Sequence, residues 1–508
     1  MSRVGSALIK GGVFRLVALA ISLLLQLAML PFILQALGSH QYGLWAVVGA
    51  ASGYYGFLDL GVSSAITRFV SRELGRGDAA KAAEYVAASR RVFLQAAVGV
   101  ALLSAVIAWF GGSFIDTDGD RLLFMQTVVI TGLGIACTFP SKVHVGILTA
   151  ELRHDVIASL GLASHLVRAG CTYLVLAQGG GLLGLAATNA AVSMLHAGAT
   201  VLAARRCCGH LPYVAGPSSM IRKELFGYAG YSLLSRLADF FRFKAHPLTI
   251  SAFLRFSDVT PYAIHDRLQS VVVSACDAVL SNLTAVFSRQ EGKEDQRAMR
   301  RLFFFAYKIS CYLGGFSLGL LVIMAPAFVE RWLGPGYGLV VTLLYIRAVG
   351  ALAGIIQMPV VNLLFGSAQN RTYAYTNCVH AALTLGSTVL LAQSWGLVGV
   401  VAGVSATTAI MKTGVQAQAA CRMVGLSLMT FHRTRTLPHL AIVTLFLLPI
   451  AGWGYLWLTP TWPRLIIFGA VSTALFGPYV FRFGFSADER SLLFRSSGFD
   501  RWLGRKAS

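Results

Sequence analysis

The sequence predicts an all-α polytopic membrane protein with about fourteen transmembrane helices, and two observations support this fold class. First, 56% of the 508 residues are hydrophobic, only 12% are charged, and the mean hydropathy is +0.67. Second, apolar runs of about twenty residues recur along the chain, and a helix of that length crosses the hydrocarbon core of a bilayer. No polar stretch approaches the ~100 residues of a usual soluble domain. Any function must therefore reside in or between membrane helices.

The individual spans follow from the apolar runs between polar breaks. They are residues 12–37, 43–66, 92–111, 122–141, 156–178, 182–204, 225–254, 263–287, 302–328, 338–365, 375–394, 396–420, 438–458 and 463–481. The first run follows Lys10 and is too long for the apolar part of a cleaved signal peptide, so we expect it to be retained. An even number of spans places both termini on the same side of the membrane.

Basic residues indicate which side that is. The formal net charge is +21, and Lys and Arg gather in the loops at 68–91 and 289–301 and in the C-terminal tail. The intervening loops are short, as at 179–181, or acidic, as at 116–120. Because loops rich in Lys and Arg stay in the cytoplasm, we expect both termini to be cytoplasmic. This rule explains the charge without a nucleic-acid partner.

A repeat divides the chain. The segment FVSRELGRGD at 69–78 returns as FSRQEGKED at 287–295, an offset of about 217 residues. It predicts two six-helix lobes in parallel repeat around a central cavity, with a substrate site at their interface. The predicted domains are an N-terminal lobe at 1–224, a C-terminal lobe at 225–421, and two further helices with a basic cytoplasmic tail at 422–508.

The seventh span carries unusual charge. Its segment SRLADFFRFKAHPLTISAF places Arg236, Asp239 and Arg242 near mid-bilayer at intervals of three residues, where each charge costs ~2.5–3.5 kcal/mol on insertion scales. One interpretation is a cluster that fixes this helix to its neighbours; the other is the wall of a water-filled cavity. With Lys244 nearby, positive charge is left over. This surplus suits a pyrophosphate, because guanidinium groups pair bidentately with phosphate oxygens.

Other cations have open assignments. Arg15 lies five residues beyond Lys10, so it either faces the cavity or extends to the inner membrane surface. Arg267 is expected to face the outer half of the cavity, with pairing to Asp266 or anchoring at the membrane interface as the alternatives. Three further cations lie in apolar runs, and no pattern says whether they face a cavity or a neighbouring helix: Arg168, Lys308 and Arg347.

Acids in apolar runs are candidates for ion coupling. Asp59 and Asp277 occupy nearly matching positions in the two repeats, and a desolvated carboxylate can carry a proton or Na⁺. The alternative is a salt bridge or a packing hydrogen bond. Asp239 is the third candidate, although its flanking arginines favour the ionised form. No Walker motif occurs and the eight cysteines lack zinc spacing, so we expect a proton or sodium gradient, and no cofactor or metal.

Several segments resemble a known family. The run LGSHQYGLWAVVGAASGYYGFLDLGVSSAITRFVSRELGRGD at 37–78 resembles the start of polysaccharide and O-antigen flippases of the multidrug/oligosaccharidyl-lipid/polysaccharide exporter superfamily. Similar segments follow: YAIHDRLQ at 262–269, FVERWLGPGY at 328–337, LLFGSAQNRTYAYTN at 363–377 and WGLVGVVAG at 395–403. The resemblance covers nearly the whole chain. It implies alternating access by two lobes that move an undecaprenyl-pyrophosphate-linked oligosaccharide across the cell inner membrane, for O-antigen or exopolysaccharide synthesis. Membrane lipids, a polysaccharide polymerase and export machinery are the implied partners.

Two other function classes fit the sequence less well than a flippase does. A cation-coupled multidrug exporter of the same superfamily needs an acidic and aromatic lining, whereas the central surplus of this chain is basic. A polysaccharide polymerase would carry a large external loop, and an acyltransferase needs a catalytic His with an acid partner. His165, His196 and His380 lie in apolar runs without an acid within a helical turn. We therefore expect a transporter with no catalytic residue, not an enzyme.

Overall fold

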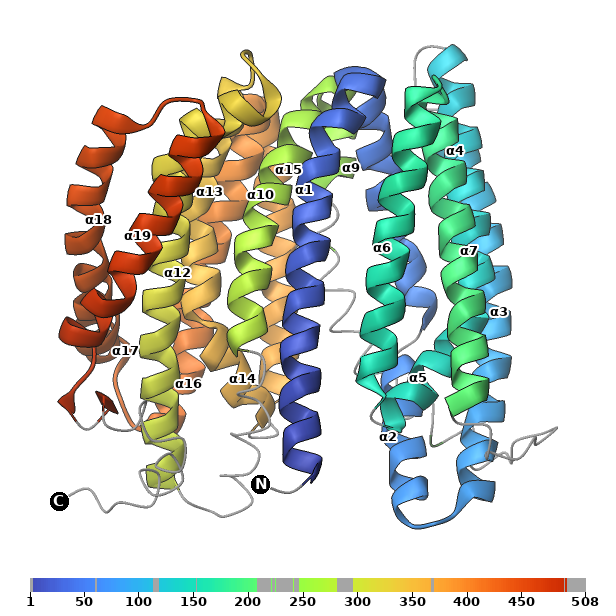
Figure 1. The fold of residues 1–508 in the computed structure, drawn as a ribbon, viewed down its shortest axis with the longest axis horizontal. Coiled ribbons are helices and arrows are strands. Elements are labelled where there is room, and N and C mark those ends of the chain that lie inside the picture. The colour runs from blue at the N-terminus through green and yellow to red at the C-terminus, as the bar shows by residue number, and fades with distance from the viewer. Residues whose placement is uncertain are drawn as a thin grey trace. The chain divides into compact units, whose positions relative to one another are not determined.

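The computed structural model contains helices and no strands in the part of the chain that it describes (Figure 1). The described residues are 3–59, 62–112, 118–151, 153–207, 221, 224, 241, 246–280, 296–366, 370–487 and 489–490. Within them, 10 helices are long and apolar enough to cross a membrane. The predicted fold class, an all-α polytopic membrane protein, is confirmed.

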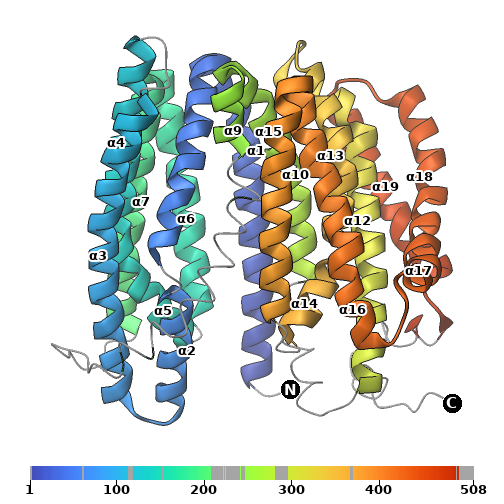
Figure 2. The ribbon, with the colours of Figure 1, turned by 180° about the vertical axis from the view of Figure 1, so that it is seen from behind.

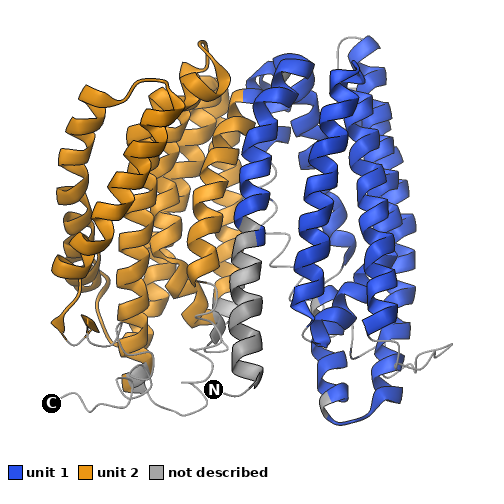
Figure 3. Cartoon of the chain, in the orientation of Figure 1, with its two compact units in different colours: residues 1–260 blue, residues 261–508 orange. Residues whose placement is uncertain are grey.

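The chain forms two compact units, residues Met1–Thr260 and Pro261–Ser508 (Figure 3). The helices of the first unit are α1 (Arg3–Ser52), α2 (Val62–Gly75), α3 (Ala79–Gly112), α4 (Asp118–Thr138), α5 (Lys142–Ala150), α6 (His154–Ala177), α7 (Gly181–Cys207) and α9 (His246–Phe253), with short 3₁₀ segments at Gly53–Asp59 and Phe139–Ser141. The predicted lobe boundaries at 224 and 421 stay a prediction.

Two predicted spans meet inside α1. Gly38 interrupts the helix with φ 73° and ψ 166°, a backbone conformation that glycine adopts without the steric cost of a Cβ. The chain therefore turns from the first span to the second within a single residue. Gly396, with φ 57° and ψ −140°, interrupts α15 in the second unit in the same way.

The core of the first unit lies where α2, α3 and the segment between α4 and α5 meet. Tyr55, Tyr85, Phe93 and Phe139 are its largest fully or almost fully buried side chains. The Ser104 hydroxyl donates to the Tyr55 hydroxyl at 2.8 Å, so α3 also holds the 3₁₀ segment before α2. Many other apolar side chains of these helices are exposed, as expected for surfaces that face lipid.

The helices of the second unit can be followed in the view from behind (Figure 2). They are α10 (Phe256–Leu280), which starts in the last residues of the first unit, then α12 (Gln296–Leu333), α13 (Gly338–Ile356), α14 (Met358–Gly366), α15 (Asn370–Ala409), α16 (Ala417–Val424), α17 (Leu428–Phe431), α18 (Leu437–Trp457) and α19 (Trp462–Phe483), with π-helical segments at Ile410–Gln416 and His432–Thr436. Most described spans match predicted ones; the seventh, 225–254, lies largely outside the described residues.

The basic loops are shorter than predicted. In place of a loop over 68–91, α2 runs to Gly75 and α3 begins at Ala79. The Asp78 carboxylate accepts a hydrogen bond from the Lys81 backbone N–H at 2.9 Å, which caps the start of α3. Likewise, α12 begins at Gln296, inside the predicted loop 289–301. Helices can continue beyond the hydrocarbon core, since charged residues such as Lys, Arg and Glu are good helix formers in water.

The last two helices pack against α12. Phe316 of α12 stacks on Phe476 of α19 with ring centroids 4.0 Å apart. The Tyr312 hydroxyl donates to the Gly484 carbonyl at 3.0 Å. Lys308 Nζ donates to both carboxylate oxygens of Glu489, at 2.8 and 3.0 Å, just after α19 ends. These contacts make α18 and α19 part of the second unit.

Candidate functional site

The structure describes only part of the predicted pyrophosphate-binding site, which we call the headgroup site. Arg236, Asp239, Arg242 and Lys244 lie outside the described residues, so their roles stay predictions. Arg15 belongs to α1, but its side chain is also outside the described part. The structure therefore places none of these five side chains.

Asp59 is buried at the end of the 3₁₀ segment before α2. Its Oδ1 accepts the backbone N–H of Ser63 at 3.0 Å, which satisfies an amide at the start of α2. Its Oδ2 lies 3.8 Å from Lys142 Nζ of α5. That ammonium also lies 3.8 Å from the centre of the Phe139 ring. The contacts of Asp59 with Ser63 and Lys142 are those expected if this acid has a structural role. Its role in ion coupling stays a prediction.

The repeat partner has a different environment. Asp277 is exposed near the described end of α10, beside the buried Cys276. Arg267 is half-buried on the same helix, ten residues earlier, and its carbonyl accepts the Ser270 hydroxyl at 2.8 Å. The repeat gives Asp59 and Asp277 nearly matching positions, yet Asp59 is buried near a lysine and Asp277 is exposed. Any coupling role would therefore differ between the two acids.

The unassigned cations contact neighbouring helices. Arg168 of α6 donates to Asn189 Oδ1 at 2.5 Å and to Ser193 Oγ at 3.1 Å, both on α7. Lys308 binds Glu489, as described above. Arg347 of α13 acts electrostatically on the buried His265 of α10. Arg168 and Lys308 thus have a role in packing within their own units.

One charged cluster was missed by sequence reasoning. Arg72 of α2 donates to Glu73 Oε1 at 2.7 Å and to Glu224 Oε1 at 3.2 Å. The Tyr85 hydroxyl of α3 donates to Glu224 Oε2 at 2.5 Å. The bond from Tyr85, followed by those from Arg72, holds the pKa of the Glu224 carboxyl below its ordinary value despite partial burial. The cluster ties Glu224, which follows the sixth span, to the hairpin between α2 and α3. The one signal of this cluster in the sequence was Arg72, because the pair Ser71-Arg72 recurs in the second repeat segment as Ser288-Arg289.

The second unit contains a chain of hydrogen bonds among buried and half-buried groups. Gln357 Nε2 donates to the Tyr307 hydroxyl at 3.4 Å, and Tyr307 and Thr436 share a hydrogen bond of 2.8 Å. Thr436 also lies 2.9 Å from Nδ1 of His432, whose Nε2 lies 2.9 Å from the Thr413 carbonyl. These hydrogen bonds connect Gln357, which lies between α13 and α14, with α12 and with both π-helical segments. Such segments occur often at functional sites.

No group of three or more His, Cys, Asp or Glu that could hold a metal ion occurs among the described residues. The candidate sites described above are separate clusters of charged and polar side chains, each within one unit.

The sequence comparison identifies the family. A sequence model of the family described as "Polysaccharide biosynthesis protein" matches residues 37–341, more than half of the chain. The chain belongs to this family. The resemblance predicted from the motifs is thereby confirmed. A protein described as "Uncharacterized membrane protein EpsK" from Bacillus subtilis (strain 168) is 23% identical over 390 residues, which cover 73% of this chain and 74% of that protein.

Solved structures share the fold at low identity. The lipid II flippase MurJ in an inward closed conformation has a TM-score of 0.73 at 12% identity, covering 93% of this chain and 99% of that one. An inward-facing multidrug resistance transporter of the MATE family has a TM-score of 0.67 at 15% identity, covering 82% and 98%. A superfamily transporter from Pyrococcus furiosus has a TM-score of 0.59 at 15% identity, covering 83% and 96%. At these identities the likeness shows that the chain shares their fold.

Proposed function

We propose that this protein is a flippase that moves an undecaprenyl-pyrophosphate-linked oligosaccharide across the cell inner membrane by alternating access. The observation that carries the proposal is that the chain belongs to a polysaccharide biosynthesis family. Its fold is also that of a solved lipid flippase. The product would serve O-antigen or exopolysaccharide synthesis, with a polymerase and export machinery downstream. Both termini would lie in the cytoplasm, and no catalytic step is required.

The MurJ fold matches more of this chain than the MATE fold does. The MurJ comparison leaves 7% of this chain uncovered, about 36 residues, so it must include part of the 87-residue segment 422–508. The MATE comparison leaves 18% uncovered, about 91 residues. In this chain, α18 and α19 are packed onto α12 and are integral to the second unit.

Charge also favours a phosphate-bearing substrate. The seventh span has an excess of Arg and Lys over acid, and guanidinium pairs well with pyrophosphate. Arg236, Arg242 and Lys244 are the proposed headgroup ligands, with Arg15 and Arg267 as further cavity cations. The fold accommodates different pocket charges, since the binding pocket of the Pyrococcus furiosus transporter has reversed polarity.

Ion coupling is part of the proposal. Asp59, Asp277 and Asp239 are the candidate carriers of a proton or Na⁺. Asp277 is exposed and Asp59 lies 3.8 Å from a lysine ammonium, so exchange of a cation at Asp59 would have to compete with Lys142.

Deletion of the gene in its own host tests the function. We expect the lipid-linked oligosaccharide to accumulate in the inner leaflet and surface polysaccharide to be lost, with unchanged sensitivity to cationic drugs. Normal surface polysaccharide together with increased drug sensitivity would instead support the multidrug exporter.

A further inference from the structure

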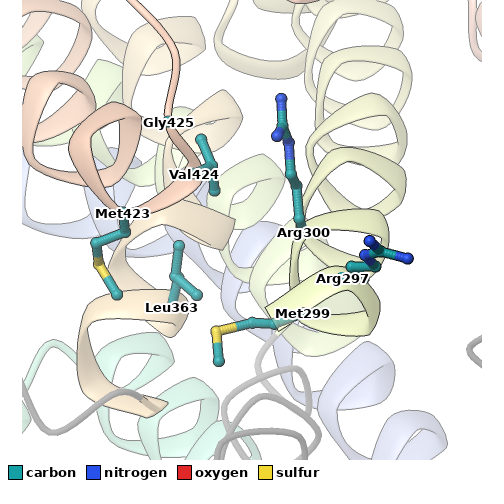
Figure 4. Close-up of a pocket in the computed structure, with 7 residues that line it drawn as sticks. All are labelled: Arg297, Met299, Arg300, Leu363, Met423, Val424 and Gly425. Carbon is teal, nitrogen blue, oxygen red and sulfur yellow. The ribbon is translucent and has the colours of Figure 1, made fainter. Parts of the chain in front are cut away.

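A pocket of about 340 Å³ opens at one end of the second unit, between α12, α14 and α16 (Figure 4). It is lined by Arg297, Met299, Arg300, Leu363, Met423, Val424 and Gly425. The proposed transport function does not involve this pocket.

The pocket lies at the level where apolar spans end. The three surrounding candidate spans are Met299–Leu333, Gly338–Leu364 and Tyr375–Val424. Met299, Leu363 and Val424 of the lining thus stand at or beside a span terminus. Because an apolar span must cover the hydrocarbon core, we infer that the pocket, at the span ends, lies at the depth of lipid headgroups. On the proposed topology, this is the cytoplasmic leaflet.

One side of the pocket is basic. Arg297 and Arg300 are three residues apart on α12, which places them on neighbouring positions of one helix face. Both side chains are exposed. The Arg300 guanidinium lies 5.6 Å from the centre of the Phe304 ring, and Arg435 lies 4.3 Å from the same centre. Arg435 therefore lies on the same ring as Arg300, and the pocket lining holds two arginines and no acid.

The other side of the pocket is apolar. Met299, Leu363, Met423 and Val424 form it, and Figure 4 shows Leu363 and Met423 across from the arginines of α12. Methionine side chains adapt to irregular apolar partners. A free anion would use only the basic side, whereas a phospholipid presents a phosphate next to apolar glycerol esters and acyl chains. The volume is at the low end of the ~300–1,000 Å³ typical of ligand pockets, too small for an oligosaccharide with its carrier.

We propose that this pocket binds an anionic phospholipid of the cytoplasmic leaflet. Arg297 and Arg300 hold its phosphate, and the two methionines contact the first carbons of its acyl chains. Basic pockets at the ends of transmembrane helices recognise anionic headgroups by this combination of charge and apolar contact. The proposal rests on the membrane topology and does not require the protein to flip a sugar lipid.

Native mass spectrometry of the full chain in detergent tests the site, with phosphatidylglycerol or phosphatidylcholine added. We expect the wild type to retain phosphatidylglycerol preferentially, and the Arg297→Gln/Arg300→Gln double variant to lose at least tenfold in its retention. Arg422→Gln is the matched control, because Arg422 is an exposed cation of α16 outside the lining. It should retain the lipid as the wild type does.

A second variant tests the apolar half without a change in charge. Met423→Trp fills the pocket and should reduce phosphatidylglycerol retention although both arginines remain. Equal retention by the wild type and the double variant would overturn the proposal, as would normal retention by Met423→Trp. Inorganic phosphate should displace the lipid weakly. Complete displacement by phosphate alone would show a simple anion site and also overturn it. Lipid retention is measured without transport, so its failure is distinguishable from failure of the flippase proposal.

Discussion

Breaking the ion pair between Lys308 and Glu489 should release the segment that follows α19. The two side chains are 13% and 14% exposed, and removing one partner of a buried pair costs ~3–5 kcal/mol. Glu489→Gln leaves the Lys308 ammonium on α12 without its carboxylate partner. Taking the lower limit of about 3 kcal/mol, local opening should become roughly 150-fold more favourable.

Hydrogen exchange followed by mass spectrometry measures this opening. The backbone amides of Gly484 and Arg490 donate to Val480 and Ser486 and report on the segment. We expect their exchange to accelerate by about two orders of magnitude in Glu489→Gln.

Two further variants isolate the pair. Glu330→Gln, at the exposed far end of α12, should leave this exchange unchanged. The double variant Lys308→Met/Glu489→Leu should recover most of the protection, since apolar replacement of a buried pair is often neutral. Unchanged exchange in Glu489→Gln, or no recovery in the double variant, would refute the assigned role of the pair.

Three other predictions concern topology, coupling and pH. An impermeant thiol reagent outside the cell should modify a cysteine introduced at Asp118 but not one at Arg76, and the reverse pattern would invert the topology. Asp59→Asn and Asp277→Asn should each slow glycan export; wild-type rates in both, with no effect of collapsing the proton and sodium gradients, would leave the acids structural. The Glu224 carboxyl has a lowered pKa in the folded protein, so its stabilising contribution is present above the unfolded pKa of about 4.3 and is lost as the pH falls through the lower folded value. The stability difference between the wild type and Glu224→Gln should therefore shrink on acidification, and a difference independent of pH would contradict this.

Local sequence patterns predicted the helices well, because apolar run length directly determines whether a helix spans the membrane. Gly38 lies between two predicted spans and Gly396 is the first residue of another, and both have a backbone conformation that favours glycine. The sequence did not predict that α2 continues to Gly75 or that α3 begins as early as Ala79. The charged residues there indicate contact with water, and they do not distinguish a loop from an exposed helix.

Partners distant in sequence could not be predicted. Lys308 and Glu489 are separated by 181 residues, and Tyr307 and Thr436 by 129. Charge in an apolar run shows that a partner or water is needed, but it does not identify which. The same limit applies to Asp59, whose contact with Lys142 comes from α5 and has no local sequence signal.

Transport of a fluorescent undecaprenyl-pyrophosphate-linked oligosaccharide in reconstituted liposomes tests the central proposal most directly. An impermeant quencher outside the vesicles reports how much labelled lipid crosses the bilayer. We expect the wild type and the charge-matched control Arg422→Gln to move the lipid, while Arg236→Gln and Arg242→Gln do not, although they are reconstituted at equal levels. Absence of movement by the wild type under an imposed ion gradient would contradict the flippase function, and wild-type movement by both seventh-span variants would contradict the headgroup site.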